Sequence, residues 1–354
     1  MTDLAVVVPT YRRPELLARC LTHLAEQTAR GRPAQVVVVE DGACPENVPV
    51  LAEARERGLP LVHVVHAEPR GPAAARNAGV ARVEVPVTVL VDDDVLLTPD
   101  ALERLCEVGL PGTDPSFSLL GLVTWHPAEP LEPFMYWQEH GGAQFDYDGI
   151  PDHWDAGWRF YGTSFVATNT ALLRRVPFDE GFSLAPYVDM ELGWRLERDH
   201  GHRVRLIPRA VGWHVHPGSL GECLASVPRL AAPATRFARG AGDPRVGETI
   251  GVEAALRLKS FVWADLVRAA ALIGELEARV PVPPRATEVY GQLWEWEWLA
   301  TAYRVLQNFF FATALRDEMG VEPLRALDAT LESTEACRRL LVRVAGPSGR
   351  RPRV

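Results

Sequence analysis

The N-terminal part of the chain alternates short apolar runs with segments whose apolar residues fall at helical spacing. The apolar runs at 4–8, 35–40, 61–65 and 87–97 predict strands. Residues 14–27, 50–58 and 70–79 predict the helices between them. Strands that alternate with helices in this way predict a parallel sheet with right-handed crossovers, the arrangement of an α/β protein.

The run 87–97 reads VTVLVDDDVLL, so an apolar strand meets the three carboxylates of Asp92 to Asp94. Ligands of open α/β sheets bind outside the carboxyl ends of the strands, and Mg²⁺ is usually shared between carboxylates and substrate phosphates. This predicts a metal–diphosphate site. The alternative is that the acids face solvent or cap the next helix, but Thr98 as N-cap and Pro99 already provide a helix start.

Polar side chains follow every other predicted strand as well. Thr10 and Tyr11 follow the first, Glu40 and Asp41 the second, and Arg70 the third. Each is ordinary alone. Because carboxyl ends of parallel strands share one edge of a sheet, we expect these residues to surround a single ligand.

Composition narrows the class of protein. The chain has 354 residues, 47% hydrophobic and 23% charged, as in soluble globular proteins. A net charge of -9 argues against nucleic acid as a partner. The five cysteines have no close pairing, which fits a reducing cytosol. Neither a signal peptide nor a transmembrane segment is expected. The predicted location is cytoplasmic, with a peripheral position at the inner membrane face as an alternative.

Four segments, VVVPTYRRPELLARCL, VVVVEDG, EPRGPAAARNAGV and VLVDDDVLLTPDAL, together resemble the nucleotide-sugar-binding half of a family 2 glycosyltransferase. The resemblance implies the GT-A fold, a Rossmann-like, mostly parallel sheet flanked by helices. It also implies a catalytic domain over residues 1–220, with a nucleotide-sugar half at about 1–108 and an acceptor half at about 109–220.

On the donor side, the resemblance implies that Pro9 to Tyr11 lie against the base and ribose of the nucleotide. Asp41 would accept a hydrogen bond from the base, usually uracil, and Glu40 replaces a more common aspartate before it. Arg70 and Arg76 would face the diphosphate or the base. The residues alone are equally consistent with a position of Arg76 on the surface of a helix.

The aspartate triplet then corresponds to the DxD motif. Asp92 and Asp94 are its outer members and the expected ligands of Mn²⁺ or Mg²⁺, with Asp94 the preferred direct ligand, and Asp93 lies near the ribose or is merely polar. Alternation along 205–216 puts His214 and His216 on one face. One of them, with His216 favoured, would complete the metal shell, as a late histidine does in many GT-A enzymes.

Residues 110–160 interrupt the alternation and are rich in aromatic residues, which predicts a long loop region or lid. Sugar rings stack on aromatic side chains. We therefore take Trp154, Trp158 and Tyr161 as weak candidates for acceptor binding, with a place in the core as the equal alternative for each.

The segment PYVDMELGWRL at 186–196 predicts a helix from about Asp189. Family members commonly carry Glu-Asp, two residues, then Leu-Gly-x-Arg-Leu. Asp189 matches the aspartate, whereas Val188 replaces the glutamate. An inverting transfer needs one carboxylate to remove the acceptor proton, and we assign Asp189, with Glu191 as the alternative. A nucleophilic Asp189 would give retention instead, and a structural role at the helix start is the remaining reading.

The C-terminal region is predicted to be a helical domain over 221–345, with helices at about 252–280, 288–319 and 322–344. Its aromatic residues suggest a core or a homodimer interface. Residues 346–354 form a basic tail that we expect to be disordered.

The sequence thus predicts a metal-dependent, inverting glycosyltransferase that uses a nucleotide-diphosphate sugar, with UDP-sugars favoured. The acceptor would be a hydroxyl group of a glycan, a lipid or a small-molecule glycoside. Two alternatives are a sugar nucleotidyltransferase, although PTYRRPE lacks the glycines of its phosphate loop, and a catalytically silent binding or scaffold protein.

Overall fold

The computed structural model describes residues 3–141, 144–150, 152–182, 187–215, 218–282 and 289–328, with side chains left out at 289–294. The chain forms two compact units. Unit 1 comprises Met1–Glu129 and Tyr147–His216, and unit 2 comprises Pro130–Asp146 and Pro217–Val354. The chain therefore leaves unit 1 at residue 130 and returns to it at residue 147.

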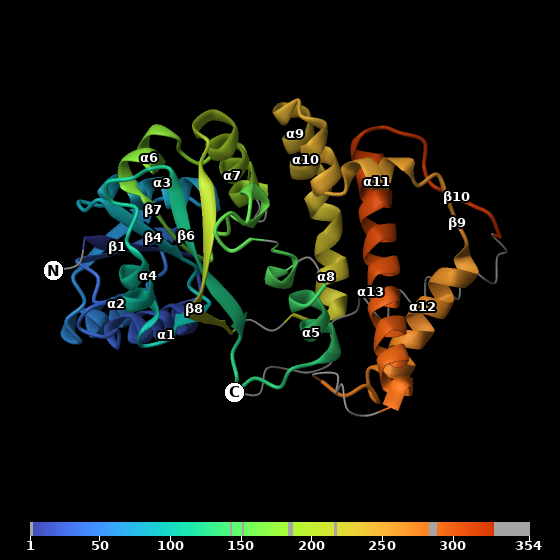
Figure 1. Ribbon diagram of the computed structural model, residues 1–354, viewed down its shortest axis with the longest axis horizontal. Helices are drawn as coiled ribbons and strands as arrows, with labels where there is room; N and C mark the ends of the chain where they lie inside the picture. Colours follow the sequence, from blue (N-terminus) through green and yellow to red (C-terminus); the bar gives the residue numbers. More distant parts are fainter. Residues whose placement is uncertain are drawn as a thin grey trace. The chain divides into compact units, whose positions relative to one another are not determined.

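Unit 1, whose N-terminal strands are blue in Figure 1, is built on an eight-stranded sheet with the strand order β3-β2-β1-β4-β7-β6-β8-β5. The strands are β1 (Leu4–Thr10), β2 (Gln35–Asp41), β3 (Leu61–His66), β4 (Val87–Val91), β5 (Val95–Leu97), β6 (Phe117–Trp125), β7 (Phe165–Asn169) and β8 (Arg203–His214). Strands β3, β2, β1 and β4 are parallel, which confirms the prediction for the N-terminal half. Strand β7 runs antiparallel to both of its neighbours, β4 and β6.

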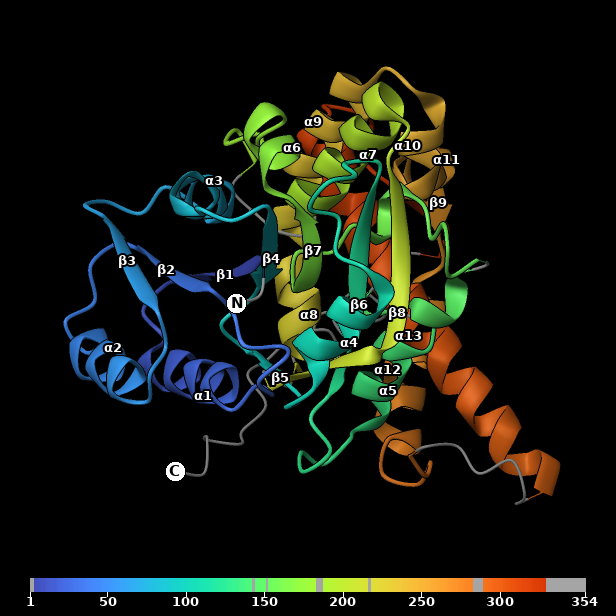
Figure 2. The same ribbon diagram turned by 60° about the vertical axis from the view of Figure 1, so that its left-hand side comes forward.

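Helices cover both faces of the parallel half. Figure 2 shows α3 (Pro72–Arg82) over one face, and α1 (Pro14–Ala25) and α2 (Asn47–Glu56) over the other. Strands β1 and β2 are buried along nearly their whole length, as expected for a sheet covered on both sides. A Cβ atom at Gly79 would lie 2.3 Å from Val7 Cγ1, so glycine permits the close approach of α3 to β1.

The remaining elements of unit 1 are α4 (Ala101–Val108), α6 (Thr170–Arg175), α7 (Tyr187–His200) and the 3₁₀ turns η1 (Tyr147–Gly149) and η2 (Trp158–Phe160). Two predictions fail in this part. The aromatic region 110–160 contains β6, because FSLLGLVTW is buried on both faces and pairs with β7 and β8. The helix after β5 begins at Ala101, while Thr98 Oγ1 donates to Asp100 Oδ1 over 3.1 Å instead of capping the helix.

The run 87–97 is also two strands and not one. β4 ends at Val91, and β5 pairs antiparallel with β8 at the edge of the sheet opposite to β3. A turn closed by the bond from Val95 N to Asp92 O separates them. The aspartates therefore lie between two strands at the carboxyl end of β4.

Unit 2 is helical. Its elements are α5 (Pro133–Glu139), α8 (Leu220–Ser226), η3 (Val227–Leu230), α9 (Ala231–Ala241), α10 (Pro244–Thr249), α11 (Val252–Arg257), β9 (Ser260–Phe261), α12 (Trp263–Leu276), α13 (Val289–Glu318) and β10 (Arg325–Ala326). Helices α12 and α13 pack along each other (Figure 1). Tyr303, fully buried on α13, contacts the rings of Phe134 and Trp137 at 5.2 and 5.5 Å.

One of the predicted C-terminal helices is confirmed and another is broken in the structure. Helix α13 confirms the one expected over 288–319. The helix expected over 252–280 is broken at Leu258, which is extended, and Arg316 donates to the carbonyls of Leu256 and Leu258 there. Residues 322–328 are not helical and include β10. Residues 329–344 and the predicted tail 346–354 lie outside the described residues.

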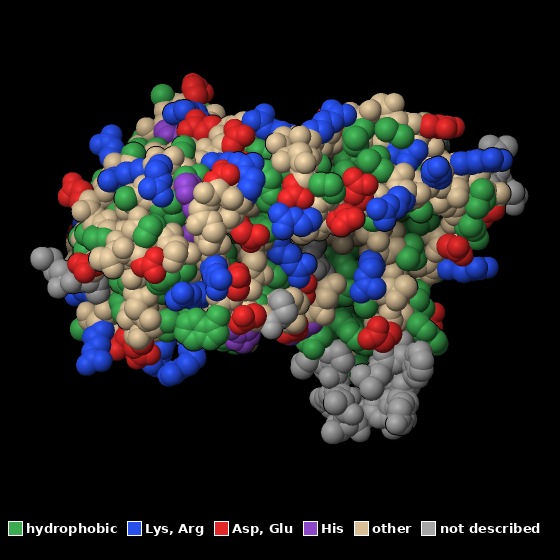
Figure 3. Space-filling model, turned by 45° about the horizontal axis from the view of Figure 1, so that its top comes forward, with side chains coloured by type: hydrophobic (Ala, Val, Ile, Leu, Met, Phe, Trp, Pro, Cys, Tyr) green, Lys and Arg blue, Asp and Glu red, His purple; other side chains and the backbone are tan. Residues whose placement is uncertain are grey.

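Within the described ranges, no helix is both long enough and apolar enough to span a membrane. On the face drawn in Figure 3, positive and negative side chains are interspersed over the coloured part of the surface.

Candidate active site

The carboxyl ends of β1 and β4 bring together four polar side chains, those of Thr10, Arg13, Asp93 and Asp94. Thr10 Oγ1 donates to Asp93 Oδ2 over 2.7 Å. Arg13, in the turn before α1, donates to Asp93 Oδ1 over 3.3 Å and to Asp94 Oδ2 over 2.9 Å. Burial raises the pKa of Asp93 to about 7, against the opposing effects of Thr10 and Arg13. Arg13 was missed from the sequence, although a basic residue directly after the first strand was a usable signal.

Asp92 points to the other side of the same turn. Its Oδ1 accepts from Arg76 Nη2 over 2.8 Å, and its Oδ2 accepts from Ser164 Oγ over 2.9 Å. Arg76 is only 3% exposed, and its Nη1 lies 3.9 Å from Asp189 Oδ1. The guanidinium therefore lies between two carboxylates. Burial lowers the pKa of Arg76, but the charges of Asp92 and Asp189 outweigh it and raise this pKa.

Asp189 occupies the first turn of α7 and is 9% exposed. Its Oδ2 accepts from the backbone N and the Oγ1 of Thr163, over 3.0 and 2.8 Å. Among the described residues its Oδ1 has no hydrogen-bond donor, only the ion pair with Arg76. Burial raises the pKa of Asp189, and Arg76 opposes this rise. A carboxylate with one anchored oxygen and a raised pKa is suited to accept a proton.

Glu191 differs in this respect. Both of its oxygens accept from Arg195, one turn further along α7, over 2.6 and 2.8 Å. Because Arg195 engages the whole carboxylate, Glu191 is a weaker candidate for a base than Asp189.

The acids after β2 hold the surrounding backbone. Asp41 Oδ1 accepts from Arg70 N, and its Oδ2 accepts from Gly71 N, over 2.8 and 2.7 Å. The Nδ1 of His66 lies 2.8 Å from Asp41 Oδ1, an interaction between neighbouring strands that the sequence did not predict. Gly71 has a φ of 92°, a conformation that glycine adopts readily. Asp41 thus fixes the start of α3.

Glu40 has a similar part, since its Oε2 accepts from Cys44 N over 3.2 Å and its Oε1 lies 3.2 Å from His63 Nε2. The remaining donor-side candidates are more open. Pro9 is half-buried in β1, Tyr11 is 47% exposed, and the side chain of Arg70 pairs with Glu180 over 2.7 Å.

Asp94 and His214 face each other. Asp94 Oδ1 lies 3.7 Å from His214 Nε2, and both residues are 8% exposed. His216 lies outside the described residues. Over the described ranges, no group of three or more His, Cys, Asp and Glu side chains is arranged to hold a metal ion. Carboxylate oxygens suit Mg²⁺ and Mn²⁺, which take their other ligands from water and substrate phosphates. The pair Asp94–His214 fits such a shared site.

The three residues predicted to bind the acceptor differ in how far their side chains are buried. Tyr161 is fully buried, and its hydroxyl lies 3.0 Å from Thr168 Oγ1. Trp158 is 9% exposed, and its backbone N donates to Glu197. The structure places both side chains in the core, where large aromatic residues gain most from burial. Trp154 is 63% exposed.

Comparison with known proteins identifies related sequences and a related fold. Residues 5–108 match the model of the family described as "Glycosyl transferase family 2". That range ends with α4 and contains Thr10, Asp41, Arg76 and Asp92 to Asp94.

Two relatives and one solved structure extend the comparison beyond this range. Validoxylamine A glucosyltransferase of Streptomyces hygroscopicus subsp. limoneus is 28% identical over 263 residues, 67% of this chain and 56% of the relative. Pre-mycofactocin glycosyltransferase of Mycobacterium tuberculosis is 27% identical over 63% of this chain and 45% of its own. The chain thus spans about half the length of these relatives.

The mannosyltransferase PcManGT from Pyrobaculum calidifontis, solved with GDP-Man and Mn²⁺, has a TM-score of 0.57 at 18% identity, over 90% of this chain and 88% of its own. This similarity confirms the GT-A fold.

Proposed function

We propose that this chain, whose residues 5–108 belong to glycosyl transferase family 2, transfers a sugar from a nucleoside-diphosphate sugar to a hydroxyl acceptor. The observation that carries the proposal is the linkage of the aspartate turn to Asp189. Arg76 pairs with both Asp92 and Asp189, so the carboxylates assigned to the donor and acceptor sides belong to one site.

On the acceptor side, Asp189 acts as general base. The acceptor oxygen forms a bond to the anomeric carbon while its proton passes to Asp189 Oδ1. The bond between the anomeric carbon and the diphosphate oxygen breaks on the opposite face, which gives inversion. Thr163 holds Oδ2 with two hydrogen bonds and thereby orients Oδ1.

On the donor side, Asp94 and His214 would hold Mn²⁺ or Mg²⁺, and Asp92 stays paired with Arg76 and Ser164. The cation would offset the negative charge that develops on the leaving nucleoside diphosphate. Asp41 positions the backbone next to the nucleotide through the amides of Arg70 and Gly71.

For the donor we propose a UDP-sugar first, with a GDP-sugar as the alternative because PcManGT was solved with GDP-Man. For the acceptor we favour a small molecule, since the two relatives are named for validoxylamine A and pre-mycofactocin. A glycan or lipid-linked acceptor, a cytoplasmic location and a homodimer through the C-terminal helices remain predictions from the sequence.

Calorimetric titration of the full chain with UDP and with GDP, in Mn²⁺ and in EDTA, tests the donor side. We expect one nucleotide to bind at least about tenfold more tightly with Mn²⁺, and Asp94→Asn to remove that difference. Asp265→Asn, at an exposed carboxylate that pairs with Arg268 on α12, is the matched control. Equal affinity of the unmodified chain in Mn²⁺ and EDTA would contradict the metal assignment.

A further inference from the structure

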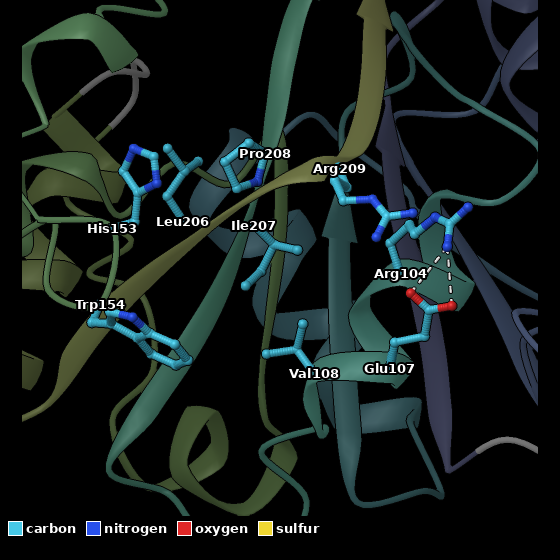
Figure 4. A pocket seen from close by; sticks show the side chains of 9 residues that line it. All are labelled: Arg104, Glu107, Val108, His153, Trp154, Leu206, Ile207, Pro208 and Arg209. Carbon is cyan, nitrogen blue, oxygen red and sulfur yellow. Dashed lines mark hydrogen bonds and ion pairs between the residues drawn. The ribbon is translucent and has the colours of Figure 1, made fainter.

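Unit 1 has a hollow of about 290 Å³ between the C-terminal half of α4 and the middle of β8 (Figure 4). It is lined by Arg104, Glu107, Val108, His153, Trp154, Leu206, Ile207, Pro208 and Arg209. Trp154 and His153 lie at one end, the arginines and Glu107 at the other, and Ile207 and Val108 between them.

Trp154 is exposed but held in place. Its backbone N donates to Asp152 Oδ1 over 2.9 Å, and His153 O accepts from Leu206 N over 2.7 Å, which fastens the loop to β8. The guanidinium of Arg205 lies 5.5 Å from the centre of the Trp154 ring. At 63% exposure, this indole gains little from burial, although the backbone that carries it is fastened to β8. Val108, also exposed at 43%, lines the same hollow and adds to its open apolar surface.

The opposite end of the hollow offers oriented polar groups. Arg104 Nη1 donates to both oxygens of Glu107 over 3.0 Å, and its Nε donates to Asp100 over 2.9 Å. Arg209 is exposed, and its side chain has no ion pair or hydrogen bond within the described part of the chain. Guanidinium groups donate and carboxylates accept, so this end can satisfy hydroxyl groups, which do both.

We propose that this hollow binds a short saccharide. One sugar ring would stack on Trp154, and hydroxyls further along the saccharide would form hydrogen bonds with Arg209 and the Arg104–Glu107 pair. Small-molecule sites have volumes of about 300–1,000 Å³, so a hollow of about 290 Å³ accommodates a short saccharide and not a whole nucleotide sugar. The apolar C–H face of a sugar ring matches the aromatic ring at one end, and the hydroxyls match the charged groups at the other.

This site is separate from the donor site. Arg209 and His214 both lie on β8, where a bulge follows Ile207 and the regular stretch Val211–His214 corresponds to roughly 10 Å of extended strand. The inference goes beyond the proposed function and does not depend on it, because binding in the hollow needs neither a nucleotide nor a metal ion.

Saturation-transfer NMR on the full chain, with methyl α-glucoside, methyl α-mannoside and maltose as probes in EDTA, tests the proposal. We expect transfer to the ring protons of at least one probe. Trp154→Ala should weaken its binding roughly fivefold or more, Trp154→Phe should restore part of it, and Arg209→Ala should also weaken it. Trp298→Ala, at a tryptophan of unit 2 that is 54% exposed, is the matched control and should leave binding unchanged.

Two outcomes would overturn the proposal: transfer to none of the probes, or transfer that survives in the folded Trp154→Ala chain. Loss of binding with Asp94→Asn alone would place the sugar at the donor site and would likewise overturn it. Circular dichroism verifies that each variant is folded. Titrations with UDP and GDP report only on the donor site. A failure of the proposed function can therefore be distinguished from a failure of the saccharide site.

Discussion

Among single residues, Arg76 has the most constrained position in the candidate site. It is nearly fully buried, yet its Nε and Nη1 have no hydrogen-bond acceptor among the described residues. Its charge is balanced by Asp92 and Asp189. Removing one partner of a buried ion pair leaves an uncompensated charge, which is strongly destabilising. Arg76 is therefore a positioning residue that holds the two carboxylates together.

Asp189→Asn should abolish transfer and preserve nucleotide binding. The asparagine oxygen can still accept from Thr163, but the side chain cannot take a proton, so we expect a loss of roughly 10²–10⁴ in turnover. A transfer assay and a nucleotide titration on the same preparation measure both effects. Glu191→Gln is the control. Near-normal turnover of Asp189→Asn, with loss in Glu191→Gln, would move the base to Glu191.

Arg76→Gln should shift the acidic limb of the pH profile of kcat/KM upward. Burial raises the pKa of Asp189, and the charge of Arg76 opposes that rise. Without this charge, Asp189 stays protonated to higher pH, and the active form with an ionised base is lost earlier as the pH falls. Arg76→Lys, which keeps the charge, should restore part of the profile. An unchanged limb in Arg76→Gln would show that Arg76 does not act through Asp189.

At the scale of elements, local patterns were enough for the parallel half of the sheet. Each of its strands is mostly apolar and is followed by a polar residue, and β1, β2 and β3 pair in chain order. Strand β5 has only three residues and pairs with β8 through residues more than a hundred positions away, which no local pattern encodes. The link from Thr163 to Asp189 was hidden for the same reason. The sequence thus indicated which acids matter but not their partners.

The junction between α7 and β8 provides a test of stability against pH. His202 is 3% exposed, with Nε2 2.8 Å from Ser118 Oγ on β6 and Nδ1 2.9 Å from Pro115 O. Burial lowers its pKa below the ordinary value of 6.5. As the pH falls, His202 therefore takes up a proton in the unfolded chain before it does so in the folded one. The contribution of the neutral His202 to the free energy of unfolding is present above about pH 6.5 and is lost as the pH drops toward the pKa of the folded state.

His202→Gln should accordingly show a smaller loss of stability between pH 7.5 and 5 than the unmodified chain, by about 1.4 kcal/mol for each unit of lowered pKa. Urea unfolding at both pH values measures this. His153→Gln, at an exposed histidine, should keep the original slope. An identical slope in His202→Gln would mean that His202 titrates alike in the folded and unfolded chain.

At the scale of the whole molecule, the two units are interleaved along the chain. Helix α5 lies within the segment 130–146, and its residues Phe134 and Trp137 are buried in one cluster with residues of α12 and α13. Their rings contact Tyr303. The core of unit 2 therefore combines residues that precede 147–216 in the sequence with residues that follow it. A boundary drawn along the sequence alone could not reveal this exchange.

A chain cut after residue 216 should therefore be prone to aggregate. It keeps Phe134 and Trp137 but lacks the α13 side chains that cover them, and exposed apolar patches promote association. Replacing 130–146 by a Gly/Ser linker in the same truncated chain should reduce the aggregation. Light scattering and binding of a hydrophobic dye measure the difference. Equal aggregation with and without 130–146 would show that α5 is not its source.

Because the two units alternate along the chain, the ribosome makes α5 long before it makes α13. Helix α5 leaves the ribosome with its aromatic side chains, whereas α13 begins roughly 150 residues later. At translation rates of about 5–20 residues per second, this interval lasts roughly 8 to 30 seconds. Throughout that time Phe134 and Trp137 have no Tyr303 to pack against. Until α13 has been made, these aromatic side chains stay exposed on the nascent chain, which makes the chain a natural substrate for a chaperone.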